Sequence, residues 1–167
     1  MIAMFVLLGI TVGMRAMTAI AVLCWFAWLQ LLPQTGKGAW AGYLVTAIVF
    51  SVMAVGEYIG DTLPKTPSRL EPVGLGARVV FGAIVGGLAA HGIFEPTAGG
   101  VIFGVVGALI GAYGGHWLRI KAAKRVGRDL PVALLGSAIA LGLSVFTCWE
   151  LHHWLVSILG VVVKSKV

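Results

Sequence analysis

Long apolar runs with almost no charge constrain this chain more than any other feature. Five of them, at positions 16–32, 40–60, 73–94, 99–118 and 131–147, come close to the roughly 20 residues that span a bilayer as a helix. Hydrophobic residues make up 59% of the 167 positions and charged residues 11%, whereas soluble domains carry roughly 25% charged residues. The sequence therefore predicts one all-α polytopic membrane domain over 1–167, with four to five transmembrane helices.

The two ends of the chain each carry a further, shorter apolar run. The run at 2–14 would reach only about 20 Å as a helix, too short to span. We expect it to form a half-helix or re-entrant segment that breaks at Gly13, and we expect a similarly short piece after His153. The first residues have neither a basic region nor a clear cleavage site, so we expect them to be retained rather than removed as a signal peptide.

The distribution of lysine and arginine predicts an orientation. Arg15, Lys65, Arg69, Arg78 and the basic segment 119–128 would share one side, whereas the opposite loops hold only Lys37. Because cytoplasmic loops are enriched in Lys and Arg, the basic side should be cytoplasmic in a bacterial inner membrane. We expect anionic lipid headgroups, and not nucleic acid, to contact the basic segment. Its cations are Arg119, Lys121, Lys124, Arg125 and Arg128.

Two short motifs each occur twice. Gly13-Met14-Arg15 resembles Gly76-Ala77-Arg78, and the pattern Gly-x-Tyr-x-Gly that begins at Gly56 recurs at Gly111. The spacing predicts two tandem helical hairpins, at about 13–69 and 76–128. Transporters often contain such repeats and place their site at the repeat interface.

Four charged residues are the leading candidates for a functional site: Arg15, Glu57, Asp61 and Arg78. Glu57 and Asp61 are four residues apart and therefore share one helix face. If the hairpins pack as repeats, the two acids face the two arginines at one depth. The set is either structural, fixing how the hairpins dock, or a polar site for an ion, a proton or an anionic headgroup. Tyr58, Tyr113 and His116 are secondary candidates.

The sequence offers no motif for catalysis or for a cofactor. It has no phosphate-binding loop, no HExxH, no CxxC and no nucleophile elbow, so we expect neither enzymatic activity nor a cofactor. His152 and His153 are adjacent and would diverge on a helix, which makes a metal site unfavourable. Cys24 and Cys148 lie in apolar runs, where we expect buried thiols rather than a disulfide.

The stretches GMRAMT, GEYIGDTLPKTPSR, GLGAR and GAYGGHWLR resemble a bacterial family of small integral membrane proteins of unknown function. The similarity covers about 13–143 and is most specific at Glu57, Asp61 and Pro64. It implies the same membrane fold and the importance of the four charged candidates, but no activity. Members often carry an acidic pair where this chain has Gly136 and Ser137.

These observations favour a small transporter or channel-like protein. A structural or assembly subunit of a membrane complex, or a lipid-binding membrane protein, is the alternative, and a membrane enzyme that acts on lipid comes third. Either leading role is compatible with a homo-oligomer or with another membrane protein as partner.

Overall fold

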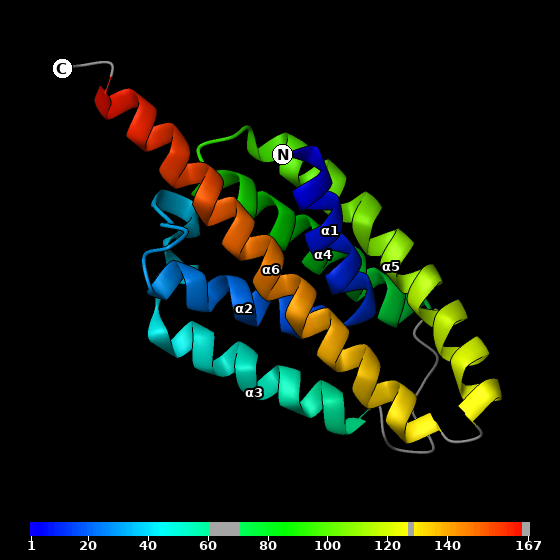
Figure 1. Ribbon diagram of the computed structural model, residues 1–167. Coiled ribbons are helices and arrows are strands. Elements are labelled where there is room, and N and C mark those ends of the chain that lie inside the picture. Colours follow the sequence, from blue (N-terminus) through cyan, green and yellow to red (C-terminus); the bar gives the residue numbers. More distant parts are fainter. Residues whose placement is uncertain (61–70, 127–128, 165–167) are drawn as a thin grey trace.

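The computed structural model describes residues 1–60, 71–126 and 129–164 (Figure 1). Within these ranges the chain is helical and contains no strand. The elements are α1 (Ile2–Met14), α2 (Ala16–Trp28), the 3-10 helix η1 (Gly36–Gly42), α3 (Leu44–Gly60), α4 (Pro72–Gly92), α5 (Thr97–Val126) and α6 (Asp129–Lys164).

Three helices are long and apolar enough to cross a membrane. They are α4, the part of α5 at Thr97–Ala122 and the part of α6 at Pro131–Gly160. The predicted run at 40–60 is broken into η1 and α3, which bend by 63° and together make a fourth candidate span. The protein is therefore a helical membrane protein with three or four candidate spans.

Up to Lys164, where the described residues end, no separate short helix follows His153. The run at 131–147 and the residues that follow it form the single helix α6 (Figure 1). Polar residues around Glu150 lower the local hydropathy, but this stretch has no proline, which would be a strong helix-stop signal. A drop in hydropathy alone does not end a helix.

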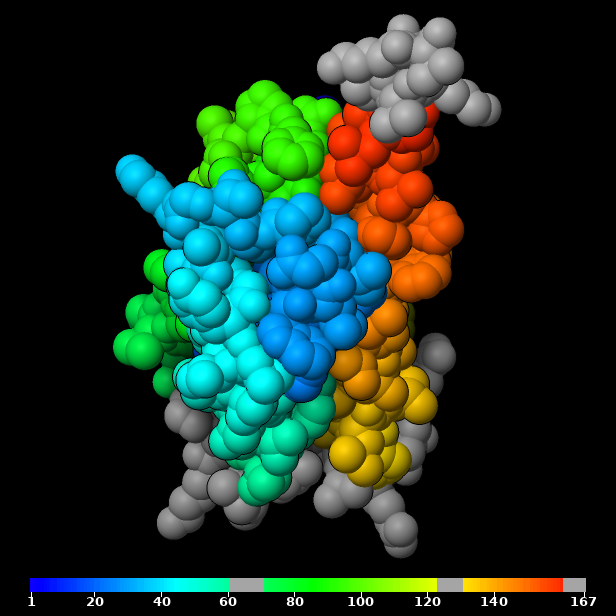
Figure 2. All heavy atoms as spheres, turned by 90° about the vertical axis from the view of Figure 1, so that its left-hand side faces the viewer, coloured from blue at the N-terminus to red at the C-terminus, as the bar shows by residue number. Residues whose placement is uncertain are grey.

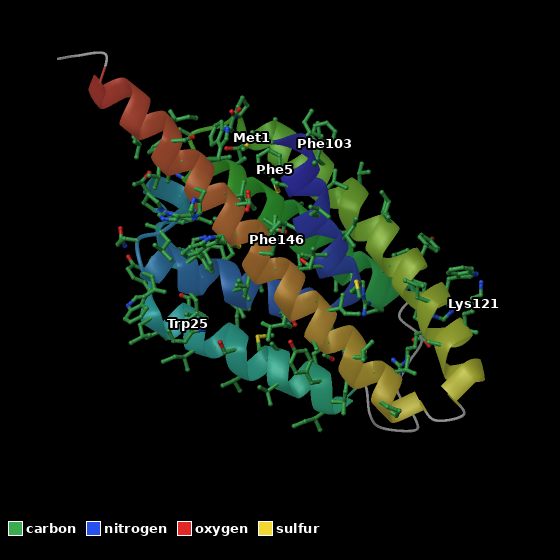
Figure 3. The ribbon with its side chains drawn as sticks, in the orientation of Figure 1. Met1, Phe5, Trp25, Phe103, Lys121 and Phe146 are labelled. Atoms are coloured by element: carbon green, nitrogen blue, oxygen red, sulfur yellow. The ribbon has the colours of Figure 1, made fainter. Side chains whose placement is uncertain are left out.

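The first helix, α1, runs parallel to α5. Gly9 packs on the backbone at Gly104 and Gly107, and Gly13 packs further along, at Ala108 and Ala112. Because α5 starts at the connection to α4, α1 also starts at that end of the bundle and points toward the other. In Figure 3, Met1, Phe5 and Phe103 lie close together at this end, and Lys121 lies at the opposite end of α5.

The second helix, α2, runs back in the opposite direction. It is antiparallel to α3, since Trp25 donates to Ser51 (2.9 Å) while Thr18 lies against Tyr58 (2.8 Å). It therefore ends on the side where α1 begins. We call this side, with residues 1, 29–43 and 93–96, the Lys37 end, and the opposite side the Lys121 end.

Together α1 and α2 form a helical hairpin that enters and leaves at the Lys37 end. The break falls at Arg15, two residues after the predicted Gly13. The predicted crossing at 16–32 is thus a helix of 13 residues, Ala16–Trp28. Figure 2 shows α2 between α3 and α6 on this face of the molecule.

Glycines let α1, α4 and α5 pack at backbone contact. A Cβ atom on Gly86 would overlap the carbonyl oxygen of Gly100, and one on Gly111 would overlap that of Ile10. Small residues at such positions drive helix association in membranes, where burial from water contributes little. The packed α5 therefore supports α4 on one side and the hairpin on the other.

The interior away from the glycines is filled by apolar side chains. Leu8, Ile20, Leu23 and Leu151 are fully buried in one cluster. Cys24 and Cys148 are also fully buried, and both are free thiols, as predicted.

The two predicted repeat units do not have matching local structure. The hairpins α2–α3 and α4–α5 follow each other, but Gly13-Met14-Arg15 ends a helix, whereas Gly76-Ala77-Arg78 lies inside α4. The structure thus gives no support for a duplication.

Alanine at Gly111 should destabilise the protein, because its Cβ would overlap the backbone at Ile10. We expect a loss of about 1–3 kcal/mol, typical of overpacking. Gly114→Ala is the matched control on the same helix, since a Cβ there meets nothing within 4 Å. Thermal unfolding in detergent should give a lower Tm for Gly111→Ala and an unchanged or higher Tm for Gly114→Ala. Equal effects would contradict the backbone contact.

Candidate functional site

Arg15 interrupts the chain between α1 and α2 in the middle of the fold. Its backbone is extended, with φ −147 and ψ 99, and its side chain is only 1% exposed. Its N–H donates to the Thr11 carbonyl oxygen (2.7 Å) and closes the last turn of α1. Non-helical backbone within a membrane domain is tolerated only where protein or a water-filled cavity surrounds it. The break therefore requires partners for the two helix ends that meet there.

Glu57 provides those partners for α2. The backbone N–H of Ala16 donates to Oε1 (3.1 Å) and that of Met17 to Oε2 (3.0 Å). The first N–H groups of a helix have no partner inside the helix, and the helix dipole is positive there. A carboxylate satisfies both requirements, so Glu57, half-buried near the end of α3, caps a helix from another part of the chain.

Arg78 contacts the end of α1. Its Nε donates to the carbonyl oxygen of Gly13 (3.0 Å), and Nη1 donates to that of Gly74 one turn earlier in α4 (2.9 Å). The side chain is 9% exposed. A cation is favourable at a helix C-terminus, where the last carbonyl groups carry partial negative charge. At the hairpin tip, the acid Glu57 thus lies at the positive start of α2, and the base Arg78 lies at the negative end of α1.

The Arg15 side chain joins the hairpin tip to α3 and α6. Nη2 donates to the Ala133 carbonyl oxygen (3.2 Å), and Nη1 lies at 3.5 Å from the backbone oxygen of Glu57. The guanidinium carbon lies 5.2 Å from the centre of the Tyr58 ring, within the range of a cation–π contact. The Tyr58 hydroxyl in turn shares a hydrogen bond with Thr18 of α2 (2.8 Å).

The structure brings together Arg15, Glu57, Arg78 and the secondary candidate Tyr58. Asp61 lies outside the described residues. The expected pairing of the acid with a guanidinium is corrected for Glu57, whose carboxylate bonds to backbone N–H groups in the part of the chain that the structure describes. These N–H groups need an acceptor, because the start of α2 is buried in the helix bundle.

The other two secondary candidates are not part of this cluster. Tyr113 is 55% exposed on the surface of α5. His116 lines a surface hollow with Trp117, Ile120 and Lys121, and the Lys121 ammonium lies 4.4 Å from the centre of the Trp117 ring. The side chains of Lys124, Arg125 and Arg128 are outside the described part of the basic segment.

Sequence reasoning missed the contribution of α6. Ala133 accepts hydrogen bonds from both Arg15 and the hydroxyl of Ser137 (2.9 Å). A hollow of about 210 Å³ opens beside it, lined by Met14, Arg119, Gly136 and their neighbours. A backbone carbonyl leaves no mark in a sequence, but the polar Ser137 in an apolar run was a usable signal. The Gly136-Ser137 pair is therefore adjacent to the Arg15 site.

Known proteins add nothing to this geometry. Comparisons with protein-family models, curated proteins and solved structures found no significant match. Among the described residues, no group of three or more His, Cys, Asp or Glu side chains is placed to hold a metal ion.

Removing the Glu57 carboxylate should destabilise the hairpin tip. Glu57→Ala leaves the N–H groups of Ala16 and Met17 without acceptors, at a cost of about 1–3 kcal/mol for each buried unsatisfied group. Glu57→Gln keeps one acceptor oxygen and should lose less. Glu95→Ala, in the connection between α4 and α5, is the control. Thermal unfolding in detergent should give the lowest Tm for Glu57→Ala, a higher Tm for Glu57→Gln and an unchanged Tm for Glu95→Ala. An unchanged Tm for Glu57→Ala would contradict the capping role.

Proposed function

We propose that this protein is a small transporter or channel-like protein whose polar site lies at the tip of the α1–α2 hairpin. The observation that carries this proposal is the helix break at Arg15, buried among α3, α4, α5 and α6. Membrane transporters commonly build their sites from discontinuous helices, whose free ends present N–H and C=O groups to ions and solutes.

The charges at the tip fit such a role. Buried Arg15 and Arg78 and half-buried Glu57 gather where two helix ends meet, and ionisable groups inside a membrane mark ion or substrate pathways more often than chance. Each of these side chains contacts a different helix, so a ligand that competes for one contact would also shift the packing of the hairpin. The hollow beside Met14 and Ala133 offers an approach from the Lys121 end.

A structural role in a membrane complex is the second candidate. The Glu57 carboxylate is occupied in capping α2, and Arg78 and Arg15 donate to backbone carbonyls. Polar groups that satisfy helix ends hold a fold together whether or not anything passes between them. The close glycine packing of α1 on α5 adds to that rigidity.

A flux assay on a variant that leaves the helix caps in place distinguishes the two roles. Thr18→Val with Tyr58→Phe removes both hydroxyls of one hydrogen bond and keeps the ring beneath Arg15, so stability should change by less than about 1 kcal/mol. Wild-type protein in liposomes should move protons, monovalent cations or small anions down imposed gradients, measured electrically. The double variant should alter the rate at an unchanged Tm.

The control for this assay is the surface change Tyr113→Phe, which should retain the wild-type rate. Folded wild-type protein that gives no current above empty liposomes for any of these ions would contradict the transport proposal and favour the structural role. A wild-type rate in the double variant would mean that the hairpin tip is not part of the transport pathway.

We further propose that the protein resides in a bacterial inner membrane with the Lys121 end in the cytoplasm, where its basic segment contacts anionic lipid headgroups. The support is that Lys and Arg are concentrated in the segments of the sequence that we assign to this end, whereas the opposite loops hold Lys37. A cysteine that replaces Lys37 should react with an impermeant maleimide in intact spheroplasts. One that replaces Lys121 should react only after the membrane is opened, and the reverse pattern would invert the orientation.

A further inference from the structure

A second hollow lies far from the hairpin tip, at the Lys37 end. It has a volume of about 560 Å³ and lies between η1, α4 and the start of α5. This volume is within the range of small-molecule sites. Its lining includes Lys37, Trp40, Ala83, Ile84, His91 and Val101.

The lining changes character along its length. Lys37, His91 and Thr97 lie where η1, α4 and α5 meet the Lys37 end. Ala83 and Ile84 lie about two turns deeper along α4, roughly 10–12 Å at 1.5 Å per residue. The hollow is therefore an apolar trough with a cation at its outer end. Trp40, from η1, lies on its wall, and tryptophan is enriched at membrane interfaces.

The wall of the trough is held in place by hydrogen bonds. His91 Nε2 lies 3.0 Å from the Thr35 carbonyl oxygen, and Gln34 Nε2 donates to the Leu88 carbonyl oxygen (3.0 Å). A Cβ on Gly38 would come within 3.3 Å of the His91 ring and of Leu88, so η1 lies directly on α4. These contacts keep the trough open without a ligand, and a preformed site costs less to occupy.

We propose that this trough binds one anionic phospholipid, with an acyl chain along Ala83, Ile84 and Val101 and the phosphate at Lys37. The solvent around a membrane protein is lipid, so an acyl chain is the apolar ligand at hand. Charge complementarity selects the headgroup, since among the described residues that line the trough Lys37 is the cation and no carboxylate is present. A zwitterionic headgroup brings its own cation and gains less from Lys37. This site is independent of the proposed transport role.

Native mass spectrometry of the full protein tests the proposal. The protein is released from mixed micelles of detergent and lipid. The lipid is an equal mixture of phosphatidylglycerol and phosphatidylcholine with identical acyl chains. The wild type should retain one phosphatidylglycerol in preference to phosphatidylcholine. Lys37→Gln should reduce that preference about fivefold, the effect of about 1 kcal/mol for one interfacial lysine. Ala83→Phe fills the trough and should reduce retention of both lipids.

Val80→Phe serves as the matched control, because it adds the same aromatic ring on an exposed part of α4 outside the trough. It should retain the wild-type lipid and its headgroup preference. Equal retention of the two lipids by the wild type would overturn the proposal, and so would a Lys37→Gln variant that keeps the wild-type preference for phosphatidylglycerol. A folded Ala83→Phe protein with unchanged retention would place the lipid elsewhere and overturn it as well.

Discussion

The capping of two helix ends inside a membrane domain is the constraint on which the rest of this structure depends. At Arg15 the chain reverses direction, so the end of α1 and the start of α2 meet inside the helix bundle, where the Arg15 side chain is 1% exposed. Unsatisfied N–H and C=O groups there would cost several kcal/mol each. Glu57 on α3 and Arg78 on α4 supply hydrogen-bond partners for these groups, and their charges match the helix dipoles. The polar residues of the interior are therefore placed by backbone chemistry before any function is considered.

The hairpin also explains why so much glycine is needed on α5. Because α1 lies parallel to α5, their dipoles do not offset one another, and association must come from close packing. Gly9 and Gly13 bring the two backbones into contact along Gly104–Ala112, where larger residues would overlap. Arg78 then offsets the partial negative charge at the end of α1. Packing and electrostatics thus act on the same short helix at different points.

The sequence predicted the helical membrane class and a cluster that includes Arg15, Glu57 and Arg78, because hydropathy and charge are local properties. It did not predict that the acid would bind N–H groups of α2, nor that Ala133 would accept from Arg15. Those partners belong to the backbone, and they exist only once the chain has folded back at Arg15. The exact end of α1 and the continuity of α6 were missed for a related reason, since apolar runs do not mark where helices stop.

Capping leaves the hairpin tip in an arrangement that is stable yet sensitive to competition. The Glu57 carboxylate is held by two N–H groups of α2, and Arg15 is held by the backbone of α3 and α6 together with the ring of Tyr58. An anion that reached the tip would compete with the carboxylate for the same N–H groups, and a cation would compete with the guanidinium groups for the same carbonyls. Because each group belongs to a different helix, either exchange would loosen a contact between the α1–α2 hairpin and its neighbours. The contacts that hold the tip together are therefore the same contacts that a ligand of the proposed site would have to displace.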